Sequence, residues 1–346
     1  MSIQSPPASL PTLTHARLPR QAPLMVAAVA AAVAVAGVVL GLGTVAAVLI
    51  GALVFIVALP VWSLVVENRR SATDRLMTGL IWATFFVALA PLVSLVWTVV
   101  AEGSQALNGT FFTYSFYRTS LDQPVGVYHA IMGTLVITGV AALISVPVGI
   151  LTAIYLIEYG KRNTFSRIVT FLVDVMTGIP SIVAGLFAFA LFTLLFGAGY
   201  QSGLGGAVAL SLLMIPTVVR ATEEMLRLVP DDLREAAYAL GTPRWRTIVR
   251  VVLPTSVGGI IAGVTLAVAR VIGETAPLLL IAGIVQRTNF NPFDGSMTTL
   301  PVLIFSERNK GNIDIVWGAA LVLMVLVMLL NVIARVLGKI LAPKQG

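Results

Sequence analysis

The chain has 346 residues, of which 58% are hydrophobic and only 11% are charged, and its mean hydropathy is +0.97. A soluble domain carries about 25% charged residues, so this composition excludes an ordinary soluble protein and indicates a helical membrane protein with several spans. The formal net charge of +7 fits positive residues in cytoplasmic loops better than nucleic-acid binding, and the lack of cysteine excludes disulfides, thiolate catalysis and cysteine–metal sites.

The N-terminal part of the chain predicts a tail followed by two spans. Residues 1–23 are rich in proline and serine and predict a disordered cytoplasmic tail. Residues 24–66 contain no charge, and their length suits two spans, 24–41 and 44–66, joined by a tight turn at Gly41-Leu42-Gly43. The arginines that follow indicate a cytoplasmic loop: Arg69, Arg70 and Arg75.

Six further apolar runs predict six further spans. They cover residues 76–100, 130–157, 168–196, 204–219, 255–284 and 315–334. Positive residues recur in alternate loops, which predicts eight spans with both termini in the cytoplasm. Residues 101–129 predict an external loop or interfacial helix, and about 30 residues before the last span predict an external loop.

A charged island, residues 220–254, separates two of these spans. It holds six arginines and five carboxylates. Asp232 and Glu235 have capping-box spacing after Pro230, so a short helix is expected there. The run Gly241-Thr242-Pro243 should end it, and a second short helix should lead to Pro254. This pattern predicts a helix–turn–helix in water, although a plain solvated loop would explain the charges too.

The spacing inside the island is similar to a known motif. Glu235-Ala236-Ala237, then Gly241, then Val251, Leu253 and Pro254 resemble the EAA…G…I-LP pattern of ATP-binding-cassette importer permeases, with valine in place of isoleucine. The resemblance implies a peg that docks into a separate ATPase subunit. Alanine would allow close approach, Gly241 would make the turn, and Glu235 and Arg244 would give polar contacts.

The seventh predicted span contains two opposite charges. Arg270 and Glu274 are four residues apart, so on a continuous helix they share one face and can form an ion pair. Gly273 and Pro277 should weaken that helix. Two interpretations stay open: a salt bridge that only fixes helix packing, or a polar station on a translocation path, where the Arg270 guanidinium would bind a tetrahedral oxyanion and Glu274 would balance it.

The fifth predicted span contains a second interruption. Gly178 and Pro180 should kink or break the helix, and Thr177 and Ser181 add hydroxyl groups. A broken helix exposes N–H groups that favour anions, but a packing kink, with Ser181 bonded back to its own helix, fits equally. Asp174 is expected to be the partner of an arginine rather than a substrate ligand.

The sequences around these two interruptions resemble one particular group of importer permeases. The run Arg270-Val-Ile-Gly-Glu274-Thr275-Ala276-Pro277-Leu-Leu resembles the signature of phosphate-import (Pst) permeases, in their A-type subunit. The run Gly178-Ile-Pro180-Ser181-Ile-Val-Ala-Gly185-Leu-Phe187 resembles the matching span of that subunit. The similarity covers roughly residues 76–338. It implies an all-α, type I (MetI-like) permease core of six spans, and residues 24–66 depart from it as two extra spans.

The family resemblance implies a multi-subunit importer in the bacterial inner membrane. Its other parts would be a second, homologous permease, a cytoplasmic ATP-binding subunit dimer and an extracytoplasmic phosphate-binding protein. The chain has no G-x-x-x-x-G-K-[ST] sequence, so we expect no enzymatic activity and no cofactor of its own, with ATP used by the partner subunit. The substrate-path residues would be Arg270, Glu274, Thr275, Ser181 and Thr177.

Three other functions remain open from the sequence. A permease for another oxyanion, such as sulfate or molybdate, would share the fold and the coupling. An ion-driven secondary transporter or channel would leave the island from Glu235 to Pro254 unexplained, and it predicts more intramembrane acids than Asp174 and Glu274. A membrane scaffold would not need Arg270 within a span.

Overall fold

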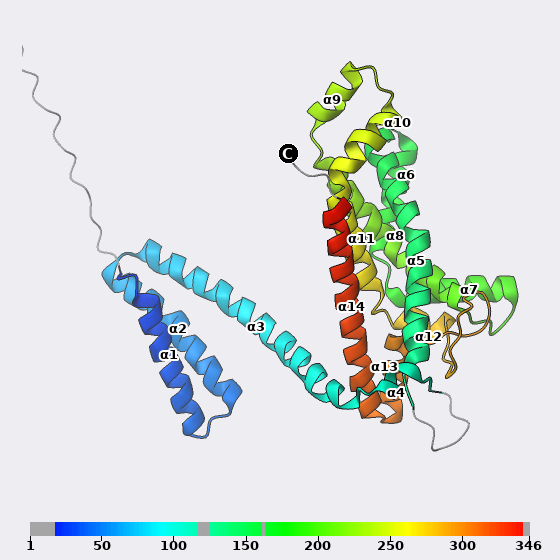
Figure 1. Ribbon diagram of the computed structural model, residues 1–346. Coiled ribbons are helices and arrows are strands. Elements are labelled where there is room, and N and C mark those ends of the chain that lie inside the picture. Colours follow the sequence, from blue (N-terminus) through cyan, green and yellow to red (C-terminus); the bar gives the residue numbers. More distant parts are fainter. Residues whose placement is uncertain (1–17, 117–124, 161–162, 342–346) are drawn as a thin grey trace, which may run out of the picture. The chain divides into compact units, whose positions relative to one another are not determined.

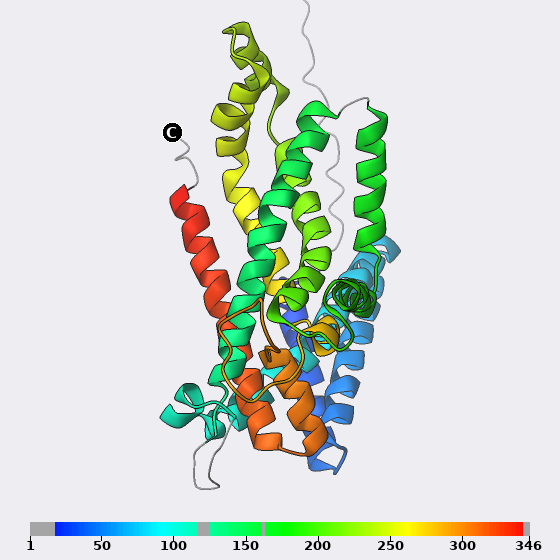
Figure 2. The same ribbon diagram turned by 90° about the vertical axis from the view of Figure 1, so that its right-hand side faces the viewer.

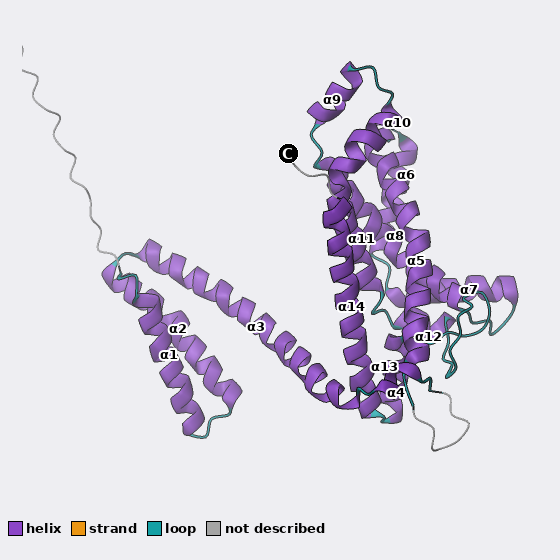
Figure 3. Ribbon diagram, in the orientation of Figure 1, coloured by secondary structure: helices purple, strands orange, loops and turns teal. Residues whose placement is uncertain are grey.

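A computed structural model describes residues 18–116, 125–160 and 163–341 of the chain. Within these ranges the secondary structure is helical and contains no strand (Figure 3). This agrees with the prediction of an all-α, polytopic fold. Residues 1–17, most of the predicted tail, lie outside the described ranges. The chain divides into two compact units, residues 1–97 and residues 98–346.

The first unit begins with a helical hairpin that matches the two predicted N-terminal spans. Helices α1 (Ala22–Val39) and α2 (Thr44–Val66) are joined by a turn in which Gly41 has a φ of +87° (Figure 1). A β-carbon on Gly51 would lie 2.8 Å from the carbonyl oxygen of Ala30. The hairpin therefore packs closely because glycine and alanine face each other across it.

The predicted cytoplasmic loop after α2 is shorter than expected. Helix α3 (Arg69–Ala106) already begins at Arg69, so Arg69, Arg70 and Arg75 lie in its first two turns rather than in a loop. The loop is reduced to Glu67 and Asn68. The prediction of a loop was wrong because a helix can continue beyond the hydrocarbon layer of the membrane. Charged residues show where the chain leaves that layer and not where the helix ends.

The second unit is built around four long helices that stand side by side (Figures 1 and 2). They are α5 (Tyr128–Ile154), which ends in the π-helical turn η1 (Tyr155–Tyr159), α8 (Gly203–Arg227), α11 (Leu253–Val271) and α14 (Ile313–Leu341). Ile137, Leu210 and Met214 form the centre of their core. Gly149 lets α5 approach α8, because a β-carbon there would lie 2.6 Å from Val218.

The fifth predicted span is broken into two helices. Helix α6 (Thr164–Thr177) ends at Gly178, and α7 (Ser181–Phe196) begins after Pro180 at an angle of 109°. Figure 1 shows α7 running across the direction of the neighbouring long helices. Seven helices of the described chain are long and apolar enough to cross a membrane, or up to eight spans if this bent pair counts as one.

The region before the last span is more ordered than predicted. It contains α13 (Leu300–Lys310), which packs on α14 and α5 through Leu300 and Leu303. Phe111 of the short helix α4 (Gly109–Thr113) joins the same hydrophobic cluster, and Asn108 caps α4 by accepting a hydrogen bond from the Phe111 amide at 2.8 Å. The prediction of a 30-residue external loop was therefore wrong over α13, whose buried leucines stabilise it through contacts distant in sequence.

The charged island forms the predicted helix–turn–helix with different boundaries. Helix α8 continues to Arg227, and α9 (Asp231–Ala239) follows. The capping box is absent, because Pro230 is the N-cap and no side chain caps the helix. The second helix does not stop at Pro254: α10 (Arg244–Thr247) runs through the π-helical turn η2 (Ile248–Val252) into α11.

Candidate functional site

The span that carries Arg270 is interrupted immediately after it. Helix α11 ends at Val271, and α12 (Ala276–Ile281) starts after a four-residue break with Pro277 in its first turn. The interruption predicted from Gly273 and Pro277 is therefore present. Arg270 occupies the last turn of α11 and is exposed, and Glu274 lies half-buried in the break.

The predicted ion pair between Arg270 and Glu274 is not formed. In the described chain, neither side chain has a salt bridge or a hydrogen bond with the other. The i,i+4 geometry holds only along a continuous helix, and the helix ends between the two residues. Within this chain Arg270 is thus an exposed cation at the end of a spanning helix, where a charge is costly unless it faces water or a partner.

The two interruptions come together in space through α7 and α12. Gly185 of α7 packs directly on Pro277 of α12, and one turn further Ile281 joins the cluster of Ala188 and Phe192. Gly185 lies in the second turn of α7, and Pro277 is the second residue of α12. The N-terminal parts of the two helices, which begin at Ser181 and follow Thr275, therefore lie close together.

Three hydroxyl groups lie at or near these helix starts. Ser181 is half-buried, and no hydrogen bond is formed by its hydroxyl within the described ranges, so it is not bonded back to its own helix. Thr275 precedes α12 without capping it. Thr177 differs, since its hydroxyl donates to the Val173 carbonyl at 2.8 Å. The start of α7 thus combines a free hydroxyl with the unpaired N–H groups of a helix N-terminus.

Asp174 is the partner of an arginine, as predicted. Arg220 of α8 forms an ion pair with Asp174 of α6 and a second one with Glu223 at 2.6 Å. The pair connects α6 to α8. Asp174 therefore has a structural partner in Arg220.

The island presents α9 at one end of the second unit (Figure 1). Glu235 and Ala236 are exposed, whereas Ala237 faces inward and is buried. Gly241 has a φ of +74°, which is the left-handed conformation expected for the turn. The exposed Arg244 stacks over the ring of Tyr159, with 5.8 Å between the guanidinium carbon and the ring centroid.

One buried ion pair near α9 was not predicted. Arg234 of α9 binds Glu158 of η1 at 3.0 Å, and the two side chains are 9% and 5% exposed. Sequence reasoning missed it because Arg234 is one of six arginines in the island, and nothing local separates it from the others. Glu158 gave one usable signal, as a lone carboxylate just beyond the end of the apolar run 130–157.

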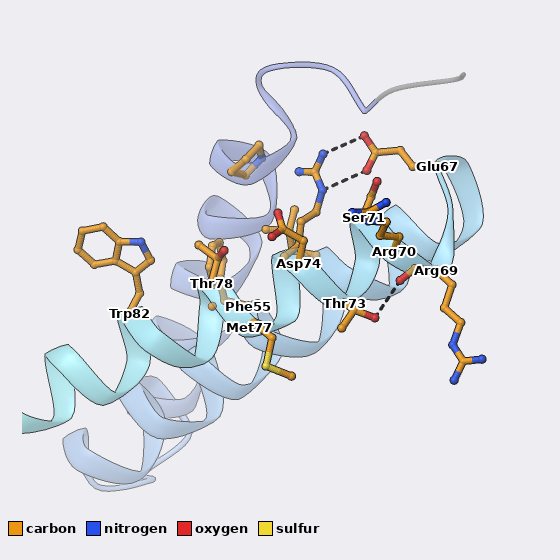
Figure 4. A pocket seen from close by; sticks show the side chains of 14 residues that line it. Phe55, Glu67, Arg69, Arg70, Ser71, Thr73, Asp74, Met77, Thr78 and Trp82 are labelled. Carbon is orange, nitrogen blue, oxygen red and sulfur yellow. Dashed lines mark hydrogen bonds and ion pairs between the residues drawn. The ribbon is translucent and has the colours of Figure 1, made fainter. Parts of the chain in front are cut away.

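A cavity in the first unit is lined by none of the predicted site residues. Its volume is about 1260 Å³, and Glu67, Arg70, Asp74 and Trp82 are among its lining residues (Figure 4). Hydrogen bonds from the Ser63 hydroxyl and the Leu18 amide, together with Arg75, lower the pKa of the Glu67 carboxyl to about 2. Glu67 is therefore a structural link between the helices of this unit.

Comparisons with known proteins give the chain its family. The family described as "Binding-protein-dependent transport system inner membrane component" matches residues 145–346. Phosphate transport system permease protein PstA 1 of Mycobacterium tuberculosis (strain CDC 1551 / Oshkosh) is 48% identical over 275 residues, which cover 78% of this chain and 90% of that protein. PstA of Pasteurella multocida (strain Pm70) is 37% identical over 271 residues, covering 77% and 95%.

Solved structures of other transporters support the assignment of the fold. A bacterial ABC transporter involved in alginate import has a TM-score of 0.56 at 16% identity, covering 78% of this chain and 98% of that chain. The MetNI methionine ABC transporter, in an inward-facing conformation, has a TM-score of 0.52 at 20% identity, covering 63% and 95%. The curated relatives are named permeases, so the chain is a multi-pass inner-membrane transport subunit and not an enzyme. The chain belongs to the binding-protein-dependent transport system inner membrane component family and, within it, is a relative of the phosphate transport system permease proteins PstA.

Proposed function

We propose that this chain is one permease subunit of an ATP-driven importer of inorganic phosphate and forms half of its translocation path. The observation that carries the proposal is the close packing of α7 on α12 at Gly185 and Pro277, which brings together the starts of two interrupted helices in the chain segment that follows the exposed Arg270. Helices that are interrupted within the membrane are typical of substrate paths. The polar backbone groups at their ends are tolerated only where they are buried in protein or line a water-filled cavity. The phosphate permeases named above support the choice of substrate.

Each residue at the interruptions has a role in this proposal. Arg270 binds two phosphate oxygens with its planar guanidinium group, for which lysine would be a poorer substitute. Ser181 and Thr275 donate hydroxyl hydrogen bonds, and the first N–H groups of α7 add a partial positive charge. Thr177 already donates to a carbonyl, so it offers only its oxygen lone pairs, for instance to a protonated phosphate. Glu274 repels the anion and keeps it from being held too tightly.

The α9 end of the second unit is where we place the ATPase. Exposed Glu235, Ala236 and Arg244 form its contact surface, Ala237 anchors α9 from inside, and Gly241 fixes the turn between the two short helices. The concentration of arginine at this end indicates the cytoplasm, with both termini on that side. A second, homologous permease, an ATPase dimer and an extracytoplasmic phosphate-binding protein complete the importer.

The proposal is tested by uptake of labelled phosphate into proteoliposomes that hold the complete complex. ATP is supplied on the ATPase side and the binding protein on the other side, with sulfate and molybdate as competitors. ATP-dependent uptake that only phosphate analogues inhibit is expected. Transport of sulfate or molybdate instead would replace the substrate but keep the mechanism, and uptake without ATP would indicate a secondary transporter.

A further inference from the structure

The buried Arg234 uses all the hydrogen-bond donors of its guanidinium group. Nε and Nη2 donate to Glu158 Oε1 at 3.2 and 3.0 Å, and Nη2 also donates to the Leu226 carbonyl at 2.9 Å. Nη1 donates to the Val229 carbonyl at 2.7 Å and to Asp231 Oδ1 at 3.1 Å. A guanidinium group carries five N–H bonds, so five contacts leave none for a docking partner. Arg234 therefore acts inside this chain and not on the surface of α9.

These five contacts come from three separate elements. Leu226 lies in the last turn of α8 and Val229 just beyond its end, where a cation is favoured. Asp231 belongs to the first turn of α9. Glu158 lies in η1, at the end of α5. One side chain thus joins α9 to two of the four long helices of the second unit, α8 and α5.

The attachment of α9 to α5 depends on the Arg234–Glu158 ion pair more than the attachment of α9 to α8 does. The chain between α8 and α9 is only Leu228, Val229 and Pro230, so those two helices stay connected in any case. Helix α5 has no such covalent connection. Throughout the described ranges the Glu158 carboxylate, which is 5% exposed, accepts hydrogen bonds from Arg234 alone. A buried carboxylate without its cation is strongly unfavourable, so α9 and the end of α5 are held to each other.

Few apolar contacts supplement this attachment. Arg234 and Ala237 are the buried residues of α9, and alanine contributes little area. A neighbouring contact, in which Arg244 stacks over Tyr159, the residue that follows Glu158, connects α10 and not α9 to η1. The attachment of α9 to α5 is therefore directional and made by side chains, and a single substitution can remove it without emptying a hydrophobic core.

We propose that Arg234 and Glu158 form a mechanical clamp: Arg234 is a positioning residue through which a displacement of α9 reaches α5 directly. The inference rests on the proposed function, since it requires an ATPase subunit that moves α9. With the clamp, α9 and the ends of α5 and α8 move as one body. Without it, α9 can tilt about residues 228–230 while α5 stays behind, and ATP hydrolysis proceeds with little transport.

The first experiment measures phosphate transported per ATP hydrolysed, in proteoliposomes with the complete complex. Glu158→Ala removes the clamp, Glu158→Gln keeps an oxygen acceptor for Arg234, and Glu224→Gln is the matched control, because Glu224 is an exposed carboxylate on α8. We expect Glu158→Ala to lower the ratio by about tenfold, Glu158→Gln to restore most of it, and the control to match the wild type. A wild-type ratio in Glu158→Ala would overturn the clamp.

The second experiment leaves Arg234 and Glu158 in place. It therefore tests the clamp even if the Glu158→Ala variant does not assemble into the complex. The chain has no cysteine, so Leu151→Cys on α5 and Ala239→Cys on α9, both exposed, take spin labels specifically if the other subunits lack cysteine. The label distance in otherwise wild-type complex should be the same with and without ATP. A distance that changes with ATP would overturn the clamp, whereas absence of ATP-driven phosphate uptake in the wild type would overturn the proposed function.

Discussion

Gly185 lies so close to Pro277 that a β-carbon on the glycine would be 2.5 Å from the proline Cα. The contact is with backbone, which cannot rotate away as a side chain can. It fixes the spacing of α7 and α12 and, through them, the relative positions of Ser181 and Thr275. Substitutions at Gly185 therefore test whether this packing builds the substrate path.

Gly185→Ala should displace α12 and lower both stability and transport. Overpacking of this kind costs about 1–3 kcal/mol, and we expect phosphate uptake to fall by about tenfold. Gly139→Ala in α5 is the matched control, because no atom lies within 4 Å of the added carbon and alanine favours a helix. Thermal unfolding and uptake of the two variants check this. Equal behaviour of both would show that the α7–α12 contact can relax.

Arg270→Gln should abolish phosphate uptake while the complex stays assembled. The substitution removes the positive charge and the two parallel N–H donors of the guanidinium group. Their loss should weaken the affinity for the anion by at least roughly tenfold. The measurement is uptake together with copurification of all subunits. Arg308→Gln, at an exposed arginine of α13, is the control for a simple change of charge. Normal uptake in the Arg270 variant would remove Arg270 from the path.

Glu274→Gln should have the opposite effect on affinity. If Glu274 weakens phosphate binding by repulsion, its neutralisation makes the site hold the anion longer. We expect the apparent KM for phosphate and the maximal uptake rate to fall together. A rise in KM would mean that Glu274 orients Arg270 or the path rather than balancing the charge.

Gly241→Ala should weaken the connection between α9 and α10. The backbone at Gly241 has a φ of +74°, where an L-residue costs about 1–2 kcal/mol. Asparagine tolerates this conformation better, so Gly241→Asn serves as the matched variant. Recovery of the ATPase subunit after detergent extraction should be lower for alanine than for asparagine. Equal recovery from both would show that the turn does not need the left-handed conformation.

The contribution of Glu67 to the stability of the protein should depend on pH only under acid conditions. Its folded pKa of about 2 lies below the ordinary value of 4.5, so its contribution to stability is complete above pH 4.5 and is lost as the pH falls towards 2. Glu67→Gln should therefore lower the thermal unfolding temperature at pH 7, and the difference from the wild type should shrink below pH 4.5. A difference that stays constant down to pH 2.5 would contradict the shifted pKa.

The sequence alone determined those features that depend on neighbouring residues. Composition fixed the helical membrane class, because long uncharged runs can satisfy their backbone in lipid only as helices. Gly178 with Pro180, and Gly273 with Pro277, located the two interruptions, since proline and glycine act on the backbone where they stand. Gly241 located the turn for the same reason.

Only the tertiary structure decided how these local features combine. No spacing in the sequence brings Gly185 to Pro277, which sets the two interruptions side by side, and none selects Arg234 for burial against Glu158. The Arg270–Glu274 pair failed as a prediction because it assumed a continuous helix, and α13 was missed because distant packing stabilises it. Contacts between residues far apart in the chain depend on how whole helices pack, and local patterns carry no information about that packing.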